Sequence, residues 1–258
     1  MRFCCLGSGS DGNGLLVESG STRILVDCGF TVAETVLRLN RAGIAPESLD
    51  GIVVTHEHAD HMGGVRPFAS RFGIPVWLTY GTLHAANGKM ADLAGLHPFD
   101  GHDPFAIGDI EVFPIPVPHD AREPVQYAFG DGARRLGLLT DIGTLTPYVV
   151  EALSGCDALV LECNHDPALL AAGSYPPLLK ARIAGHQGHL SNEASADLLR
   201  AMDCTKLQHL IAAHLSRENN RPELARGALA GALGCSEDWI GIALQSTGFE
   251  WRDINLPS

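Results

Sequence analysis

Residues 51–64, GIVVTHEHADHMGG, join a β-branched run to an unusual concentration of metal-binding side chains. His56, His58, Asp60 and His61 fall within six consecutive positions, and two glycines follow shortly after them. The spacing is not the HExxH of a zinc-protease helix, because Asp60 stands where the second histidine would have to be. A strand that turns here toward a helix directs these side chains to two neighbouring points. The stretch therefore predicts a metal centre, and its spacing suits two ions better than one.

Three later segments each add one candidate ligand at the end of a predicted strand. They are PIPVPHDA, RRLGLLTDIG and LIAAHLSRENN. Each ligand alone would be an ordinary polar residue at the start of a loop, but together they complete the site. The expected ligand sets are His56, His58 and His119 for one ion, Asp60, His61 and His214 for the other, and Asp141 as the bridge. Nitrogen and oxygen donors of this kind favour zinc or manganese, and iron is also compatible.

Strand-like and helix-like segments alternate in two successive blocks, one in each half of the chain. Strands are predicted over 2–6, 14–19, 22–27, 51–55, 75–78, 109–117, 125–129, 134–141, 157–162 and 207–214, and helices over 32–43, 65–72, 192–202 and 222–233. Ser191 or Asn192 is expected to cap the third of these helices. We find no linker or repeat, so residues 1–258 are expected to form a single domain. Two sheets packed together with helices outside them would bury this much apolar sequence.

The glycines of LGSGSDGNG spell GxGxxG, with Asp27 twenty residues beyond Gly7. This is the spacing of a dinucleotide-binding turn, but that turn requires a following helix whose N-terminus meets the pyrophosphate. Two short strands are predicted instead. The motif is therefore interpreted as a glycine-rich turn, although its free amides could still line an anion site.

The composition limits the classes of function. The chain has 258 residues, 45% hydrophobic and 19% charged, with a net charge of -12. Such an acidic protein is not expected to wrap nucleic acid over a large surface. No apolar run is long enough for a transmembrane helix, and the N-terminus lacks the apolar core of a signal peptide. The seven scattered cysteines indicate reduced thiols, so a cytoplasmic protein without membrane contact is expected.

With HEHADH and the later His, Asp and His, the whole chain resembles the metallo-β-lactamase superfamily. The resemblance implies a four-layer αββα sandwich, an α/β fold of two mixed sheets with helices outside and the metals at one sheet edge. The motifs LGSGSDGNG, PHDAREPVQYAF, LTDIG, LECNHD, GHLSN and AHLSRENN are similar to the bacterial YycJ/WalJ branch, which is grouped with nuclease-type phosphodiesterases. Asp141 stands where zinc β-lactamases usually have Cys. The PHDAR segment differs from the HTPGH of glyoxalase II-like enzymes, and the layout resembles ribonuclease Z.

The resemblance implies a hydrolase that uses a metal-bridging hydroxide as its nucleophile. Asp60 then counts among the catalytic residues. Glu162 and His189 occupy the segments in which ribonuclease Z-like enzymes carry a proton-donating pair. Asp27 would orient the ligand loop from behind. From the residues alone, Glu162 could equally pair with an arginine, His189 could merely precede a helix cap, and Asp27 could be a strand-end turn residue.

Weaker candidates for substrate binding lie beside these motifs. Asn164 and His165 follow Glu162, and Arg217, Asn219 and Asn220 follow His214. Turn, solvation or capping roles explain them equally well. The expected enzyme is a phosphodiesterase, exonuclease-like on nucleic-acid ends. A hydrolase of lactones, thioesters, cyclic nucleotides or another small phosphoester stays open, as does a regulatory module with a vestigial metal site. The sequence leaves the oligomeric state undetermined.

Overall fold

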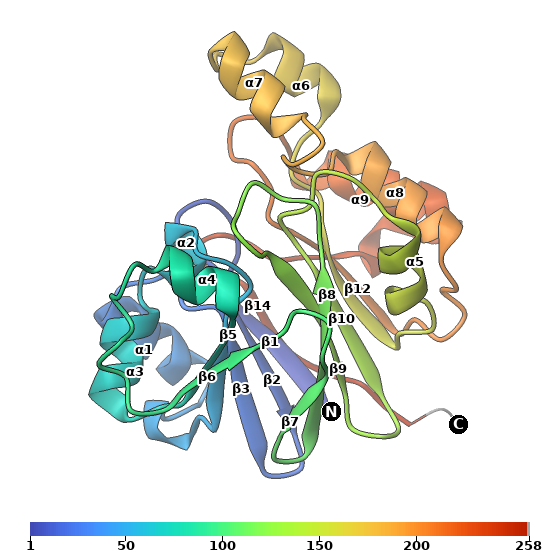
Figure 1. Cartoon of the computed structure of the whole chain (residues 1–258). Coiled ribbons are helices and arrows are strands. Elements are labelled where there is room, and N and C mark those ends of the chain that lie inside the picture. The colour runs from blue at the N-terminus through green and yellow to red at the C-terminus, as the bar shows by residue number, and fades with distance from the viewer. Residues whose placement is uncertain (257–258) are drawn as a thin grey trace.

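A computed structural model describes residues 1–256 of the chain. Two seven-stranded β-sheets pack face to face, and helices cover the outer face of each (Figure 1). This is the four-layer αββα sandwich that the sequence predicts. The first sheet is built mainly by the N-terminal half of the chain and the second by the C-terminal half.

The first sheet has the order β14-β1-β2-β3-β4-β5-β6. Its strands are β1 (Arg2–Gly7), β2 (Gly14–Ser19), β3 (Thr22–Val26), β4 (Gly51–Val53), β5 (Val76–Thr79), β6 (Leu96–Phe99) and β14 (Phe249–Asp253). The pairings from β14 to β3 are antiparallel, and those from β3 to β6 are parallel. Strand β14, the last strand within residues 1–256, thus forms an edge of the first sheet.

The second sheet repeats the same pattern in the order β7-β8-β9-β10-β11-β12-β13. Its strands are β7 (Phe105–Ile107), β8 (Ile110–Pro116), β9 (Val125–Gly130), β10 (Arg135–Leu139), β11 (Ala158–Glu162), β12 (His209–Ala213) and β13 (Gly241–Ile242). The pairings from β7 to β10 are antiparallel and those from β10 to β13 parallel. Strand by strand, β10 therefore corresponds to β3, and β11 to β4.

The helices are distributed over both outer faces and one end of the sandwich. They are α1 (Val32–Arg41), α2 (Ala59–Met62), α3 (Val65–Phe72), α4 (Tyr80–Ala85), α5 (Pro147–Leu153), α6 (Pro167–Ala172), α7 (Pro177–Ile183), α8 (Asn192–Ala201) and α9 (Pro222–Leu233), with 3-10 turns Pro46–Ser48 and Glu237–Trp239. Helices α1 and α3 lie on the first sheet, and α5, α8 and α9 on the second (Figure 1). Helices α6 and α7 project from one end.

Three apolar clusters correspond to the three interfaces between the four layers. The central cluster joins the inner faces of the two sheets and includes Phe3, Val53 and Tyr127. One outer cluster packs the first sheet against α1 and α3, and the other packs the second sheet against α5, α8 and α9. Side chains that alternate along each central strand supply both an inner and an outer layer. Each sheet is thereby buried on both faces.

Most predicted elements occur, with ends shifted by a few residues. Ser191 caps α8, since its hydroxyl accepts a hydrogen bond from the Ala194 amide. The strand predicted over 51–55 ends earlier, at Val53. The prediction missed the short helices α2 and α4 to α7 and the short strands β6, β7, β13 and β14, because their periodic patterns span too few residues to be distinguished from loops.

No helix within residues 1–256 is long and apolar enough to cross a membrane. The seven cysteines all lie in the described part of the chain and are free thiols. Burial raises the pKa of the Cys4 thiol well above its ordinary range and that of the Cys5 thiol to about 12. These two thiols therefore belong to the apolar layers rather than to a reactive site.

Tyr127 provides a test of how the second sheet supports the ligand-bearing loop of the first. Its ring is fully buried, and its hydroxyl donates a hydrogen bond of 2.6 Å to the carbonyl oxygen of Val54. We expect Tyr127→Phe to lower the free energy of unfolding by about 1–3 kcal/mol, since a buried carbonyl loses its donor. Urea denaturation measures this. Tyr148→Phe, on the exposed side of α5, should change it by less than about 0.5 kcal/mol. Equal effects would contradict this role for Tyr127.

Candidate metal centre and active site

The candidate site lies where strands of both sheets end at the same edge of the sandwich. Strands β3, β10 and β12 are followed there by Asp27, Asp141 and His214. All three have positive φ angles, of 59°, 51° and 55°. Non-glycine residues seldom adopt this left-handed conformation, which costs free energy and tends to occur at functional sites. These turns bring the three side chains together at the candidate site.

After β4, the stretch HEHADH begins as a loop and continues into the short helix α2. Because β4 ends at Val53, His56 and His58 lie in a loop, and not at the end of an extended strand as predicted from the sequence. The rings of His56 and His58 still lie close together, with centroids 4.5 Å apart. Helix α2 carries Asp60 and His61, and the His61 amide donates to the carbonyl of His58. The loop and helix together present all four side chains to the site.

The structure brings the seven predicted ligands together, and their donor atoms fall into overlapping groups that could hold metal ions. The groups, each with donor atoms within 4.8 Å of one another, are His56, His58 and His119; Asp60, His61 and His214; His56, His61 and Asp141; and Asp141, Glu162, His189 and His214. The first two are the predicted ligand triads. The third group joins Asp141 to one histidine of each triad. This is the position expected of a residue that bridges two metal ions.

Unpaired buried atoms provide an independent test of whether a cation fits. His56 Nε2 and His214 Nε2 are buried and have no hydrogen-bond partner. Asp141 Oδ2 is also buried without a hydrogen bond, although it lies 3.2 Å from His61 Nε2. Buried polar atoms are nearly always paired. Divalent cations would satisfy these imidazole nitrogens and this carboxylate oxygen together, so the donor set fits metal ions.

Asp27 holds the ligand loop from behind. Its Oδ2 lies 2.8 Å from His61 Nδ1 and accepts from the Thr55 hydroxyl, while its Oδ1 accepts from the Thr55 amide. This contact at Nδ1 directs the opposite nitrogen of His61 into the site. Burial acts to lower the pKa of His61, but the charges of Asp141 and Asp27 outweigh it and raise that pKa well above its usual range. The site therefore strongly favours positive charge.

Glu162, at the end of β11, has the corresponding position behind the second sheet's ligands. Its side chain is completely buried, and its Oε1 lies 2.9 Å from His189 Nδ1 and 3.1 Å from His214 Nδ1. The backbone amides of Asp141, Ile142 and Leu190 also donate to it. Burial acts to raise the pKa of Glu162, but the charge of His189 and its hydrogen bond outweigh burial and lower the pKa to about 2. Glu162 thus orients two histidines at once.

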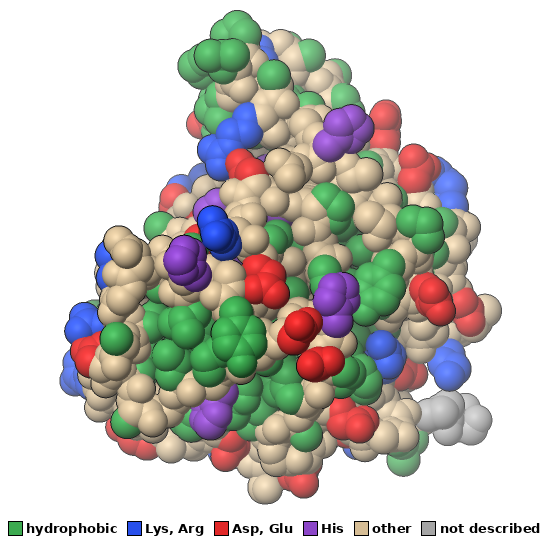
Figure 2. Space-filling model, viewed as in Figure 1, with side chains coloured by type: hydrophobic (Ala, Val, Ile, Leu, Met, Phe, Trp, Pro, Cys, Tyr) green, Lys and Arg blue, Asp and Glu red, His purple; other side chains and the backbone are tan. Residues whose placement is uncertain are grey.

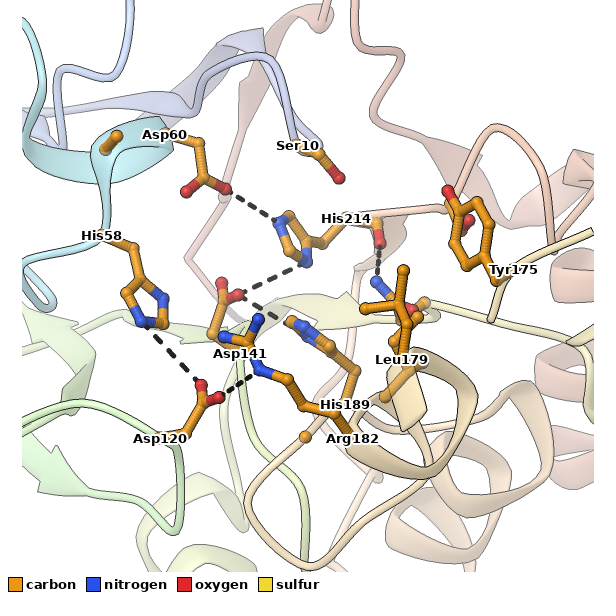
Figure 3. Close-up of a pocket in the computed structure, with 15 residues that line it drawn as sticks. Ser10, His58, Asp60, Asp120, Asp141, Tyr175, Leu179, Arg182, His189 and His214 are labelled. Carbon is orange, nitrogen blue, oxygen red and sulfur yellow. Dashed lines mark hydrogen bonds and ion pairs between the residues drawn. The ribbon is translucent and has the colours of Figure 1, made fainter. Parts of the chain in front are cut away.

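A pocket of about 380 Å³ opens in front of these residues (Figure 3). The predicted site residues that line it are His58, Asp60, Asp141, Asn164, His189 and His214. The remaining predicted metal ligands, His56, His61 and His119, and also Glu162 are buried behind this surface. His189 is 22% exposed and Asp60 24%. These two side chains therefore contact the buried site residues and can also reach a ligand in the pocket.

The predicted substrate-binding residues divide into two groups. Asn164 lines the pocket, and its amide donates to the backbone oxygen of His214. His165 is buried and does not line the pocket. Asn219 and Asn220 are buried beside it, where Asn220 donates to the Cys163 carbonyl and to Asn192. The contacts of Asn220 favour support of the loop that carries His214, and substrate binding by His165, Asn219 and Asn220 stays a prediction.

Arg217 lies outside the pocket. It pairs with Asp11 at 2.6 Å, is 63% exposed, and lines a neighbouring hollow of about 410 Å³ that shares Ser216 with the pocket. A contact between Arg217 and the group that reacts in the pocket is therefore not supported. A longer substrate that passes over Ser216 could still reach it.

Several residues around the site were not predicted from the sequence. Asn13, in the glycine-rich turn, accepts from Gly9, donates to Asp60 and lies 3.0 Å from His61 Nε2. Asp120 directly follows His119 and lies 3.5 Å from His119 Nε2, so its place in PHDAR was an available signal. Further pocket residues come from separate segments without a motif; they are Ser10, Tyr175, Leu179 and Arg182.

Comparisons with known proteins agree with this architecture. Residues 22–215 match the model of the Beta-lactamase superfamily domain. The chain is 36% identical over 239 residues to exodeoxyribonuclease YycJ of Bacillus anthracis, covering 90% of this chain and 89% of that protein. It is 32% identical over 246 residues to exodeoxyribonuclease WalJ of Streptococcus pneumoniae, covering 93% and 91%. The crystal structure of the metallo-beta-lactamase fold protein YhfI from Bacillus subtilis superposes with a TM-score of 0.75 at 16% identity, covering 98% and 99%.

The fold and the site together define a metal-dependent hydrolase. By these matches the chain belongs to the metallo-β-lactamase superfamily, as its motifs suggested. Its similarity to YycJ and WalJ extends over nearly the whole of each chain. The likeness to YhfI, at low identity, supports the fold alone.

Asp27 can be tested separately from the residues that face the pocket. Asp27→Asn removes the carboxylate charge behind His61 and should weaken zinc binding about 10- to 100-fold. Competition with a chromophoric zinc chelator measures the affinity, and circular dichroism checks the fold. Asp50→Asn is the matched control, because Asp50 accepts a backbone hydrogen bond from Arg23 on the same sheet, away from the site. Unchanged zinc affinity in Asp27→Asn would show that Asp27 stabilises the loop but does not contribute to metal binding.

Proposed function

We propose that the protein is a phosphodiesterase that requires two divalent ions and removes nucleotides from the ends of DNA. Two curated relatives that share about a third of their residues with this chain bear the name exodeoxyribonuclease. The ligand set, which has Asp rather than Cys at position 141, is also compatible with phosphodiester chemistry. Zinc and manganese are the ions most compatible with these imidazole and carboxylate donors.

The two ions would be held by the two triads, with Asp141 between them. His56, His58 and His119 would hold one, and Asp60, His61 and His214 the other. Divalent ions in such a site supply a nucleophile at neutral pH by lowering the pKa of water, and they stabilise negative charge on phosphate oxygens. Asp60 has a second contribution, because its exposed side brings its charge to the mouth of the pocket. There it would help to hold one of the ions.

The position of His189 is the observation that carries the proposal. Its Nδ1 contacts Glu162 at 2.9 Å, its ring lies beside His119 and His214, and it lines the pocket. The opposite ring nitrogen is thereby available to a substrate. Glu162 favours the protonated ring, and a protonated histidine can donate its proton to the oxygen that leaves phosphorus. Poor leaving groups such as the alkoxide of a nucleotide need this proton most.

A second candidate is the hydrolysis of a small phosphodiester, for example a cyclic nucleotide. The size of the pocket favours a small substrate, since its volume of about 380 Å³ is near the lower end of the usual range of small-ligand sites. The net charge of -12 also favours a short substrate over a long duplex. On the face in Figure 2, basic side chains are scattered among acidic ones.

A nuclease assay separates the proposed functions. Pure protein with Mn²⁺ or Zn²⁺ is incubated with DNA and RNA labelled at one end, single-stranded or duplex. We expect release of label from DNA ends, and loss of that release with a chelator or in Asp141→Asn. Two bound ions per chain without cleavage of any oligonucleotide, but with hydrolysis of bis(p-nitrophenyl) phosphate, would favour the small phosphodiester. Bound metal without turnover of any ester would favour a regulatory module.

Glu162 and His189 should differ in their effect on metal binding. His189→Ala should keep the metal and slow cleavage about 10²- to 10⁴-fold, because only the proton donor is removed. Glu162→Ala should slow cleavage and also weaken metal binding, since His214 loses its partner. Metal analysis after dialysis and single-turnover cleavage measure the two effects. The control is His186→Ala, an exposed histidine three residues earlier. Loss of metal from His189→Ala would contradict the role given to His189.

A further inference from the structure

Helices α6 and α7 form a hairpin that projects from the sandwich next to the candidate site (Figure 1). The hairpin lies in the chain between Glu162 and His189, the two residues of the proposed proton-donating pair. Every residue of α7 is described by the structure, and none is buried. Leu178 is 87% exposed, and hydrophobic side chains cover the tip of this projection in Figure 2. The hairpin therefore adds little to the apolar core.

One face of the α7 segment is directed to the pocket. Tyr175, Leu179, Arg182 and Ile183 all line it, and they are spaced as i, i+4, i+7 and i+8. Leu179, Arg182 and Ile183 lie on α7, where this spacing places them on one side of the helix. Tyr175 precedes the helix and lines the same pocket. Figure 3 displays Tyr175, Leu179 and Arg182 around the same space as Asp141, His189 and His214. We refer to these four residues as the α7 face: one aromatic ring, two aliphatic side chains and one guanidinium group.

Hydrogen bonds at the base of the hairpin fix the α7 face relative to the candidate metal centre. Arg182 Nε donates to Asp120 Oδ2 at 2.6 Å. The Asp120 amide donates to the carbonyl of Gln187, and the His189 amide to the carbonyl of Ile183. His119 Nδ1 lies 3.1 Å from the carbonyl of Gly188. The segment that follows α7 is thus hydrogen-bonded to residues on both sides of the site. These bonds fix the position of the α7 face relative to the candidate metal centre.

The charge of the α7 face distinguishes it from the rest of the pocket. Among the described residues that line the pocket, Arg182 is the only lysine or arginine. Its side chain is 61% exposed, so it can contact a ligand while it pairs with Asp120. Asp60, Asp120 and Asp141 provide negative charge nearby. A ligand that uses the whole pocket should therefore carry an anionic group toward Arg182 and a flat apolar group toward Tyr175 and Leu179.

We infer that the α7 face binds the terminal nucleotide of a DNA strand in unpaired form. The base packs on Tyr175 and Leu179, and a phosphate next to it contacts Arg182. Aromatic side chains bind unpaired bases by stacking, with little dependence on sequence. A pocket of about 380 Å³ is large enough for one nucleotide. This inference rests on the proposed function, and it specifies a single-stranded end as the substrate.

The test compares two DNA strands in two proteins. One single-stranded oligonucleotide is intact, and the other has an abasic residue at the end from which the wild-type protein releases label. The wild-type protein should cleave the intact strand with a kcat/KM roughly 5- to 150-fold higher, which corresponds to the stacking of one base. Tyr175→Ala should remove most of this preference. A purely structural defect would slow both strands equally and leave the preference unchanged.

Matched controls are available on the same helix and elsewhere on the surface. Leu179→Ala should reduce the preference for the intact strand, whereas Leu178→Ala, the exposed neighbour, should preserve it. Arg182→Gln should raise KM for both strands. Its control is Arg200→Gln, because Arg200 also pairs with an aspartate at 2.6 Å and is similarly exposed, on α8 away from the pocket.

The possible results lead to different conclusions. Cleavage of both strands at equal rates by the wild-type protein would overturn the inference but leave the nuclease function intact. An unchanged preference in Tyr175→Ala would also overturn it. Failure to cleave any oligonucleotide, with hydrolysis of bis(p-nitrophenyl) phosphate, would overturn the proposed function and this inference together. A blunt duplex cleaved as fast as the single strand would exclude an unpaired end as the substrate.

Discussion

The arrangement of the site depends on the burial of one carboxylate, that of Glu162. A fully buried carboxylate is stable only when its oxygens are well supplied with hydrogen bonds or opposite charge. Here three backbone amides and two imidazoles supply them, from the ends of β10 and β12 and from the segment before α8. The parallel strands β10, β11 and β12 must end in register for these groups to meet. The same bonds that compensate the charge fix the directions of His189 and His214.

Asp27 orients a histidine at the end of the first sheet, as Glu162 orients two histidines at the end of the second. Each carboxylate lies behind the site, accepts a backbone amide and contacts Nδ1 of a histidine whose other nitrogen faces inward. The strand orders of the two sheets are the same, and Asp27 and Asp141 both follow the strand at which antiparallel pairing changes to parallel. The candidate metal centre is therefore composed of two similar half-sites, and neither half of the chain supplies both ligand triads.

The sequence allowed the fold class and the ligand cluster to be predicted, because both depend on local patterns. HEHADH is contiguous, and His119, Asp141 and His214 each follow a strand with a clear apolar pattern. The double role of Glu162 could not be predicted, because its contact with His214 joins residues 52 positions apart through the alignment of parallel strands. Arg182 and Tyr175 were missed for a related reason. Their relation to the pocket depends on the path of the α6–α7 hairpin, which carries no motif.

The pairing of β14 with β1 has a consequence for the order in which the chain can fold. Strand β1 begins at Arg2, and its outer neighbour β14 ends at Asp253. During synthesis from the N-terminus, the first sheet lacks this neighbour until residues 249–253 have left the ribosome. The edge of β1 stays open for that time, and open edges can pair with other chains. The first sheet can therefore be completed only after the described strands of the second sheet have been synthesised.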